Sequence, residues 1–111
     1  MKVYLSGKIT GKKIDIAMAD FEFAKQQVLS NADLLLTGIY EGQILEVVNP
    51  FEINKHLIKA GHANWARYMR NDIKALMDCD AIAMMPDWRQ SKGARLEVYI
   101  ARKLNFLKIE L

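Results

Sequence analysis

The chain has 111 residues, about half of them hydrophobic and a quarter charged, which is typical of a single globular domain. Its net charge of +3 at pH 7 suits a small anionic ligand as well as nucleic acid. Because the Lys and Arg residues are scattered along the sequence, without a basic helix, we expect no nucleic-acid polymer as a partner. A single cysteine, Cys79, excludes a disulfide within the chain, and two histidines argue against a metal site, so we expect neither metal nor cofactor.

The apolar runs of the chain are short. None approaches the roughly 18 residues of a membrane-spanning helix. The apolar part of the first stretch, MKVYLSG, is also too short for a signal peptide. We therefore expect a cytoplasmic protein that does not bind membranes and folds as one domain over residues 1–111.

The first half of the chain predicts a strand, a helix and a second strand. Residues 2–6 are typical of a buried strand, which the loop GKITGKK follows. The next helix has a buried face marked by apolar residues at i, i+4, i+7 and i+11: Ala17, Phe21, Ala24 and Val28. Residues 33–43 are ambiguous between a short edge strand and a loop. Residues 44–48 indicate a second buried strand, which ends at the sequence NPF.

The second half predicts three helices and two strands. In chain order these are a helix over 52–62 that ends near Gly61, a long helix over 64–79, a strand over 81–85, a helix over 93–104 and a strand over 106–111. Strands that alternate with helices predict a flavodoxin-like, three-layer α/β/α fold, with a parallel sheet of four to five strands in the order 2-1-3-4. Ligands of such sheets bind beyond the carboxyl ends of the strands, here the loops after Ser6, Val48 and Met85.

Two acidic residues occupy helix positions where apolar residues are expected. In the last predicted helix, Glu97 falls on an apolar face: Ala94, Val98, Ile100, Ala101 and Leu104. In the long helix, Asp72 lies in the middle of an apolar arc: Trp65, Tyr68, Met69, Ile73, Leu76 and Cys79. An ionised carboxylate is costly to bury unless it is paired, protonated or part of a site. Each residue alone fits a structural network equally well, but the pair favours a shared site for acid–base or nucleophilic work on a glycosidic bond.

Two loops at this edge supply candidate ligand-binding residues. Ser91 and Gly93 precede a helix N-terminus, whose amides and dipole favour an anion such as phosphate. The loop after the first strand offers a close backbone approach and a positive charge through Gly7, Lys8, Ile9, Thr10 and Gly11. Each of these residues taken singly fits a plain turn or a helix cap about as well.

Three further residues near this edge each have a structural alternative. Tyr4 could point its hydroxyl at the cleft or belong to the core, Asn49 could orient a ligand or only start a turn, and Trp88 could stack on a base or cover the core. The two histidines, His56 and His62, are expected at the surface.

Three motifs of the chain resemble a known superfamily. YLSGKITG at residues 4–11, the stretch from Asp72 to Asp80, and SKGARLE at residues 91–97 are similar to motifs of the nucleoside 2-deoxyribosyltransferase-like superfamily. The most similar branch consists of small domains of unknown function. The resemblance covers nearly the whole chain and is least clear over residues 31–45. It implies a flavodoxin-like fold and a homodimer or larger homo-oligomer in which the partner subunit completes the site.

The resemblance also implies roles for matching residues. Glu97 matches the glutamate that attacks the anomeric carbon of a 2-deoxyribosyl group, Asp72 an aspartate that assists protonation of the departing base, and Tyr4 a tyrosine that orients the glutamate. Ser91 matches a serine that holds the 5′-phosphate in the deoxynucleoside-monophosphate N-glycosidases. The glycines of the first ligand loop match Gly7 and Gly11.

The sequence departs from the N-glycosidases at a few of these positions. Arg95 stands where they have a second glycine, and Lys8 and Thr10 stand where they have other polar groups. We expect a nucleoside 2-deoxyribosyltransferase or a deoxynucleotide N-glycosidase, with a deoxynucleoside or deoxynucleotide as its small-molecule partner. A non-catalytic nucleotide-binding module and a structural or interaction protein with a buried carboxylate network stay open as alternatives.

Overall fold

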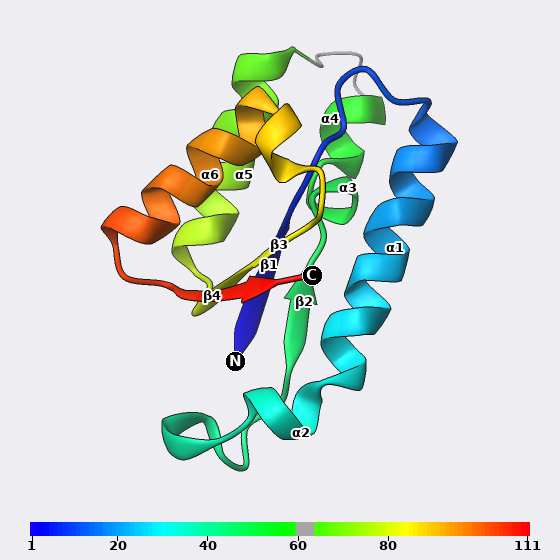
Figure 1. Ribbon diagram of the computed structural model, residues 1–111. Helices are drawn as coiled ribbons and strands as arrows, with labels where there is room; N and C mark the ends of the chain where they lie inside the picture. The colour runs from blue at the N-terminus through cyan, green and yellow to red at the C-terminus, as the bar shows by residue number, and fades with distance from the viewer. Residues whose placement is uncertain (60–63) are drawn as a thin grey trace.

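Four parallel strands form one sheet at the centre of the molecule (Figure 1). The computed structural model describes residues 1–59 and 64–111. The strands are β1 (Lys2–Ser6), β2 (Glu46–Val48), β3 (Ala81–Met84) and β4 (Leu107–Glu110). They lie in the order β2-β1-β3-β4, and every neighbouring pair is parallel. The predicted flavodoxin-like arrangement and strand order are therefore confirmed.

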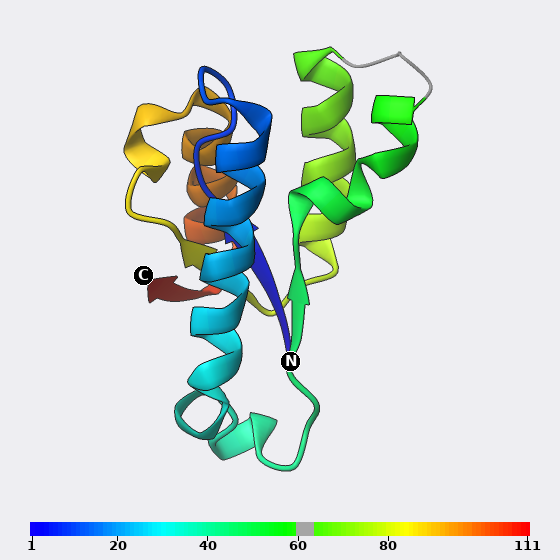
Figure 2. The same cartoon turned by 90° about the vertical axis from the view of Figure 1, so that its right-hand side faces the viewer.

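Helices cover both faces of the sheet. Helix α1 (Ile14–Ser30) lies on one face, and helices α5 (Trp65–Met77) and α6 (Lys92–Lys103) lie on the other (Figures 1 and 2). Because side chains alternate along a strand, Val3 and Leu5 of β1 pack toward α1, whereas Tyr4 packs toward α5 and α6. The buried face of α1 is the predicted one: Ala17, Phe21, Ala24 and Val28.

The segments between these elements differ in part from the prediction. Residues 33–43 contain no strand; helix α2 (Ala32–Leu35) and a 3-10 turn, η1 (Gly38–Tyr40), fill most of this stretch. The second strand begins two residues later than expected, because Ile44 is 81% exposed and has no core to contact. A further 3-10 turn, η2 (Trp88–Gln90), lies in the loop after β3.

The prediction of a single helix over residues 52–62 is wrong. The structure has two short helices there, α3 (Pro50–Ile53) and α4 (Lys55–Lys59), interrupted at Asn54. Helix α3 starts early because Pro50 occupies its first turn and the Asn49 side chain caps it, accepting a hydrogen bond from the N–H of Phe51. The expected end near Gly61 and the position of His62 lie outside the described residues.

Two residues predicted on the buried faces of helices are exposed. Leu104 is 55% exposed because it follows the last residue of α6, at the turn into β4. Trp65 is 41% exposed because it opens α5. In the part of the chain that the structure describes, no helix combines the length and the apolar character needed to cross a membrane.

Candidate functional site

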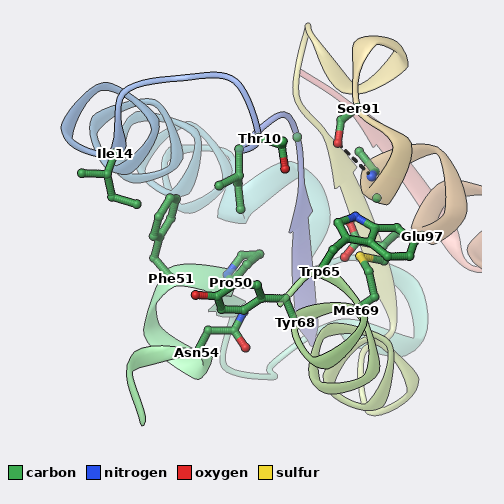
Figure 3. A pocket seen from close by; sticks show the side chains of 14 residues that line it. Thr10, Ile14, Pro50, Phe51, Asn54, Trp65, Tyr68, Met69, Ser91 and Glu97 are labelled. Atoms are coloured by element: carbon green, nitrogen blue, oxygen red, sulfur yellow. Dashed lines mark hydrogen bonds between the residues drawn. The ribbon is translucent and has the colours of Figure 1, made fainter. Parts of the chain in front are cut away.

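A cavity of about 230 Å³ lies at the carboxyl end of β1. At this strand the chain order of the sheet reverses, because β2 and β3 flank β1 on opposite sides. Helices α5 and α6 direct their N-terminal ends toward the cavity, and α3 closes its opposite side (Figure 3). Its walls consist of Gly7, Ile9, Thr10, Ile14, Pro50, Phe51, Asn54, Trp65, Tyr68, Met69, Ser91, Gly93, Ala94 and Glu97.

Glu97 brings a carboxyl group to the cavity wall. It is 4% exposed, and both of its oxygens accept hydrogen bonds from β1. The hydroxyl of Tyr4 donates to Oε2 over 2.5 Å, and the hydroxyl of Ser6 donates to Oε1 over 2.8 Å. Burial raises the pKa of Glu97 to about 8; the nearby Asp72 also raises this pKa, and the two hydrogen bonds lower it. At neutral pH Glu97 is therefore mostly protonated, and only a minor fraction is ionised.

Ser6 is a site residue that the sequence analysis missed. It is fully buried at the end of β1, on the same strand face as Tyr4. The two-residue period of a strand could have predicted this position, because Ser6 lies two residues after Tyr4 and so must face α6 as Tyr4 does. The predicted pairing of Tyr4 with Glu97 and the unpredicted contact of Ser6 thus have one geometric cause.

Asp72 is buried beside the cavity but does not line it. The amide of Asn54, which does line the cavity, donates a 2.8 Å hydrogen bond to Oδ1 of Asp72. Burial raises the pKa of Asp72 to about 6, against a lowering by this hydrogen bond. Asn71 completes the network, because its amide donates to Oδ1 of Asn54 over 2.8 Å and to the Ile53 carbonyl over 3.0 Å.

Asn54 is the second site residue that the sequence analysis missed. A continuous helix over 52–62 would have left this asparagine at an ordinary helical position. The break between α3 and α4 places it instead at the cavity wall, 4% exposed, with both ends of its amide hydrogen-bonded. An asparagine inside a predicted helix is the signal, because such residues favour helix ends.

Ser91 and Gly93 lie at the cavity wall, at the start of α6. The Ser91 hydroxyl oxygen accepts a 3.2 Å hydrogen bond from the N–H of Ala94 and so caps the helix. A hydroxyl that accepts this bond can also donate one, so the capping and ligand-binding roles predicted for Ser91 are compatible. A Cβ at Gly93 would approach the sulfur of Met69 to 2.9 Å, so the glycine lets these helices pack closely here.

The loop after β1 contributes only part of its predicted set. Gly7, Ile9 and Thr10 line the cavity, whereas Lys8 and Gly11 do not. The backbone N–H of Lys8 donates to Oδ1 of Asp87 over 3.1 Å, which ties this loop to the loop after β3.

Ion pairs reinforce the same connection between the two loops. Lys12 forms ion pairs with Asp87 and with Asp20, the latter over 2.8 Å. The positive charge of this lysine is therefore already matched by two carboxylates. Gly11 has a φ of +89°, a value that favours glycine, so it serves the turn of this loop.

Trp88 and Asn49 lie away from the cavity wall. Trp88 is buried in the core with Tyr4, and the guanidinium groups of Arg89 and Arg102 lie 4.6 and 5.5 Å from its ring. The aromatic rings at the cavity come instead from α3 and α5: Phe51, Trp65 and Tyr68. Asn49 is buried as the cap of α3.

Arg95, the main departure from the N-glycosidase pattern, points away from the cavity. It is exposed, and its guanidinium donates to the carbonyl of Arg89 over 3.4 Å. The arginine therefore leaves the space in front of Glu97 open.

His56 is exposed, as predicted. Among the described residues, no group of three or more His, Cys, Asp or Glu side chains is placed to hold a metal ion.

The cavity thus combines aromatic walls with the hydrogen-bonded carboxyl group of Glu97 and the N-terminus of α6. Planar rings can stack on its aromatic side, and a hydroxylated ring can reach Glu97.

A family model described as a domain of unknown function (DUF4406) matches residues 1–109. Comparison with curated proteins and with solved structures found no match.

Proposed function

This chain belongs to the DUF4406 family, and we propose that it cleaves or transfers the N-glycosidic bond of a 2-deoxyribonucleoside or its 5′-monophosphate, with Glu97 as the nucleophile. The observation that carries the proposal is the position of Glu97: buried at the wall of an aromatic cavity and held through both oxygens by Tyr4 and Ser6. The resemblance to the nucleoside 2-deoxyribosyltransferase-like superfamily supports the same role for this glutamate.

Hydrogen bonds to both oxygens are compatible with nucleophilic attack. A carboxylate oxygen has two lone pairs, so each oxygen of Glu97 keeps one after accepting from Tyr4 or Ser6. One oxygen attacks the anomeric carbon, and the bond from this carbon to the base nitrogen breaks with its electron pair on the base. Water then hydrolyses the glycosyl ester, or a second base takes the sugar.

The departing base needs a hydrogen-bond donor and a proton. Asn54 lines the cavity, and its second amide hydrogen can stabilise negative charge on the base. Because Asp72 contacts Asn54 and does not line the cavity, we assign Asp72 to hold this amide, and water supplies the proton. At the N-terminus of α6, the hydroxyl of Ser91 and the backbone N–H groups after it are the proposed site for a 5′-phosphate.

Base release tests the proposal directly. The protein is incubated between pH 6 and 9 with a panel of deoxynucleosides and their 5′-monophosphates, and free base is measured by chromatography. We expect release of base from at least one member of the panel. The rate should rise with pH through about 8, because the ionised form of Glu97 is the nucleophile. Glu97→Gln should abolish release, whereas the exposed control Glu110→Gln should retain it. Release from no member at high enzyme concentration would contradict the proposal.

A non-catalytic nucleotide-binding module is the second candidate. The raised pKa of Glu97 favours it, because a neutral carboxyl at pH 7 binds hydroxyl groups well and attacks carbon poorly. This function predicts that nucleotides raise the melting temperature of both the wild type and Glu97→Gln, without release of base. The homo-oligomeric state and the cytoplasmic location expected from the sequence stay predictions.

A further inference from the structure

Half of the positive charges of the chain lie on one layer of the fold. Of its 16 Lys and Arg residues, eight belong to α5, η2 and α6, and all eight are exposed: Arg67, Arg70, Lys74, Arg89, Lys92, Arg95, Arg102 and Lys103. The acidic residues within these three elements are Asp72 and Glu97, and both are buried. These three elements therefore carry exposed cations and no exposed carboxylate within their bounds, and the exposed Asp78 lies at the C-terminal cap of α5. We call these eight residues the basic face.

The helical period places the cations of α5 and α6 on the outward side of the layer. Arg67, Arg70 and Lys74 recur at i, i+3 and i+7 of α5, opposite its buried residues. In α6, Lys92 and Arg95 recur at i and i+3, and Arg102 and Lys103 continue the same side. Helices α5 and α6 lie on one face of the sheet (Figure 1). Because their buried residues face the sheet, the exposed cations of both helices lie on the side away from it.

Exposed aromatic rings accompany the cations. The amino group of Lys92 lies 4.2 Å from the ring centre of Trp65, and that of Lys103 lies 5.6 Å from the ring centre of Tyr99. The two rings are 41% and 59% exposed. Trp65 also lines the cavity, so the basic face begins at the cavity rim. Positive charges beside exposed rings are typical of surfaces that bind single-stranded nucleic acid.

We propose that the basic face binds single-stranded nucleic acid. The cations neutralise successive phosphates, and the rings of Trp65 and Tyr99 stack on bases, which requires the bases to be unpaired. The scatter of Lys and Arg along the sequence predicted no such partner, but the fold gathers half of them on one surface. Binding to this face does not depend on the proposed function.

Fluorescence anisotropy of a labelled twelve-nucleotide oligodeoxythymidylate tests this proposal. The test variant is Arg70→Glu with Arg95→Glu. Its control is Lys13→Glu with Lys108→Glu, which changes the net charge equally at exposed positions outside the basic face. At low salt we expect the test variant to bind at least tenfold more weakly than the wild type, and the control less than threefold. The slope of log K against log salt should be shallower by about 0.7 for each lost phosphate contact.

Several outcomes would overturn the proposal. These are no binding of the oligonucleotide at low salt, equal weakening by both double variants, or tighter binding of a duplex of the same length. Variant-sensitive binding of phosphatidylserine vesicles without oligonucleotide binding would instead assign the face to an anionic membrane. Circular dichroism checks that both variants are folded. Anisotropy reports binding and not base release, so this proposal and the proposed function can fail separately.

Discussion

The hydroxyl of Tyr4 donates a 2.5 Å hydrogen bond to Oε2 of Glu97, and so joins the first strand to the last helix. Burial, together with the neighbouring Glu97, raises the pKa of Tyr4 well above its ordinary value. Tyr4 therefore stays a neutral donor over the whole pH range in which Glu97 ionises. The group whose charge changes is Glu97, and its ionisation governs several measurable properties.

Glu97→Gln should make the protein more stable at alkaline pH. The folded-state pKa of Glu97, about 8, lies above its ordinary value of 4.5, so the folded state keeps a proton that the unfolded chain has lost between these limits. The free energy of unfolding of the wild type therefore falls as the pH rises from about 4.5 to about 8. Glutamine cannot ionise, so the variant should gain on the order of 4 kcal/mol at pH 8 and almost nothing at pH 4.

Urea denaturation between pH 4 and 9 measures this difference. In Glu97→Gln the free energy of unfolding should still fall with pH, less steeply and between about pH 4 and 6, because the pKa of Asp72 is also raised, from 3.8 to about 6. The exposed control Glu110→Gln should follow the wild-type curve. Parallel curves for the wild type and Glu97→Gln would show that Glu97 is ionised in the folded protein at neutral pH.

Tyr4→Phe and Ser6→Ala should each raise the pKa of Glu97 above about 8. Both hydroxyl groups donate to the ionised carboxylate and stabilise it, so their loss favours the protonated form. Carbon-13 NMR titration of the glutamate carboxyl groups measures the change. Tyr99→Phe is the matched control, because this tyrosine is 59% exposed. A pKa that is unchanged in both variants would contradict the hydrogen bonds described for Glu97.

The two tryptophans should respond differently to ligand. Trp65 lines the cavity and is 41% exposed, whereas Trp88 is 8% exposed and belongs to the core. We expect a bound nucleoside to quench the fluorescence of the wild type and of Trp88→Phe, but not of Trp65→Phe. Trp88→Phe should in turn lower the free energy of unfolding by about 1 kcal/mol or more, because it leaves a core space unfilled. Quenching that persists in Trp65→Phe would place the ligand elsewhere.

Gly7→Ala and Gly93→Ala should differ in stability. A Cβ at Gly7 would lie 2.9 Å from Cβ of Met85, which cannot rotate away, so we expect a loss of about 1–3 kcal/mol. A Cβ at Gly93 would meet the mobile sulfur of Met69 at the same distance, and alanine suits a helix better than glycine. Gly93→Ala should therefore change the stability by less than about 1 kcal/mol, as urea denaturation would show. Equal losses would contradict this difference.

The elements of the sheet could be predicted because each has a strong local pattern. The strand at residues 2–6 and the buried face of α1 match the prediction residue by residue. The early start of α3 has a local signal in Asn49 and Pro50, which the prediction did not use. The contact of Asn54 with Asp72 could not be predicted, because these residues are 18 positions apart in the sequence. Residues 33–43 have no clear period, so nothing local could distinguish short helical turns from an edge strand.

Sequence periodicity determined the alternation of strands and helices and the inward direction of Glu97 and Asp72, and the right-handedness of parallel crossovers then gave the expected strand order. The alternation and the inward directions follow from repeats of two and 3.6 residues, which a half-buried strand or helix carries in its own sequence. Only the tertiary structure decided which groups meet. It brought Ser6 to Glu97, put Asn54 between the cavity and Asp72, and turned Arg95 outward. Such contacts depend on the packing of helices across a sheet, which no local repeat encodes.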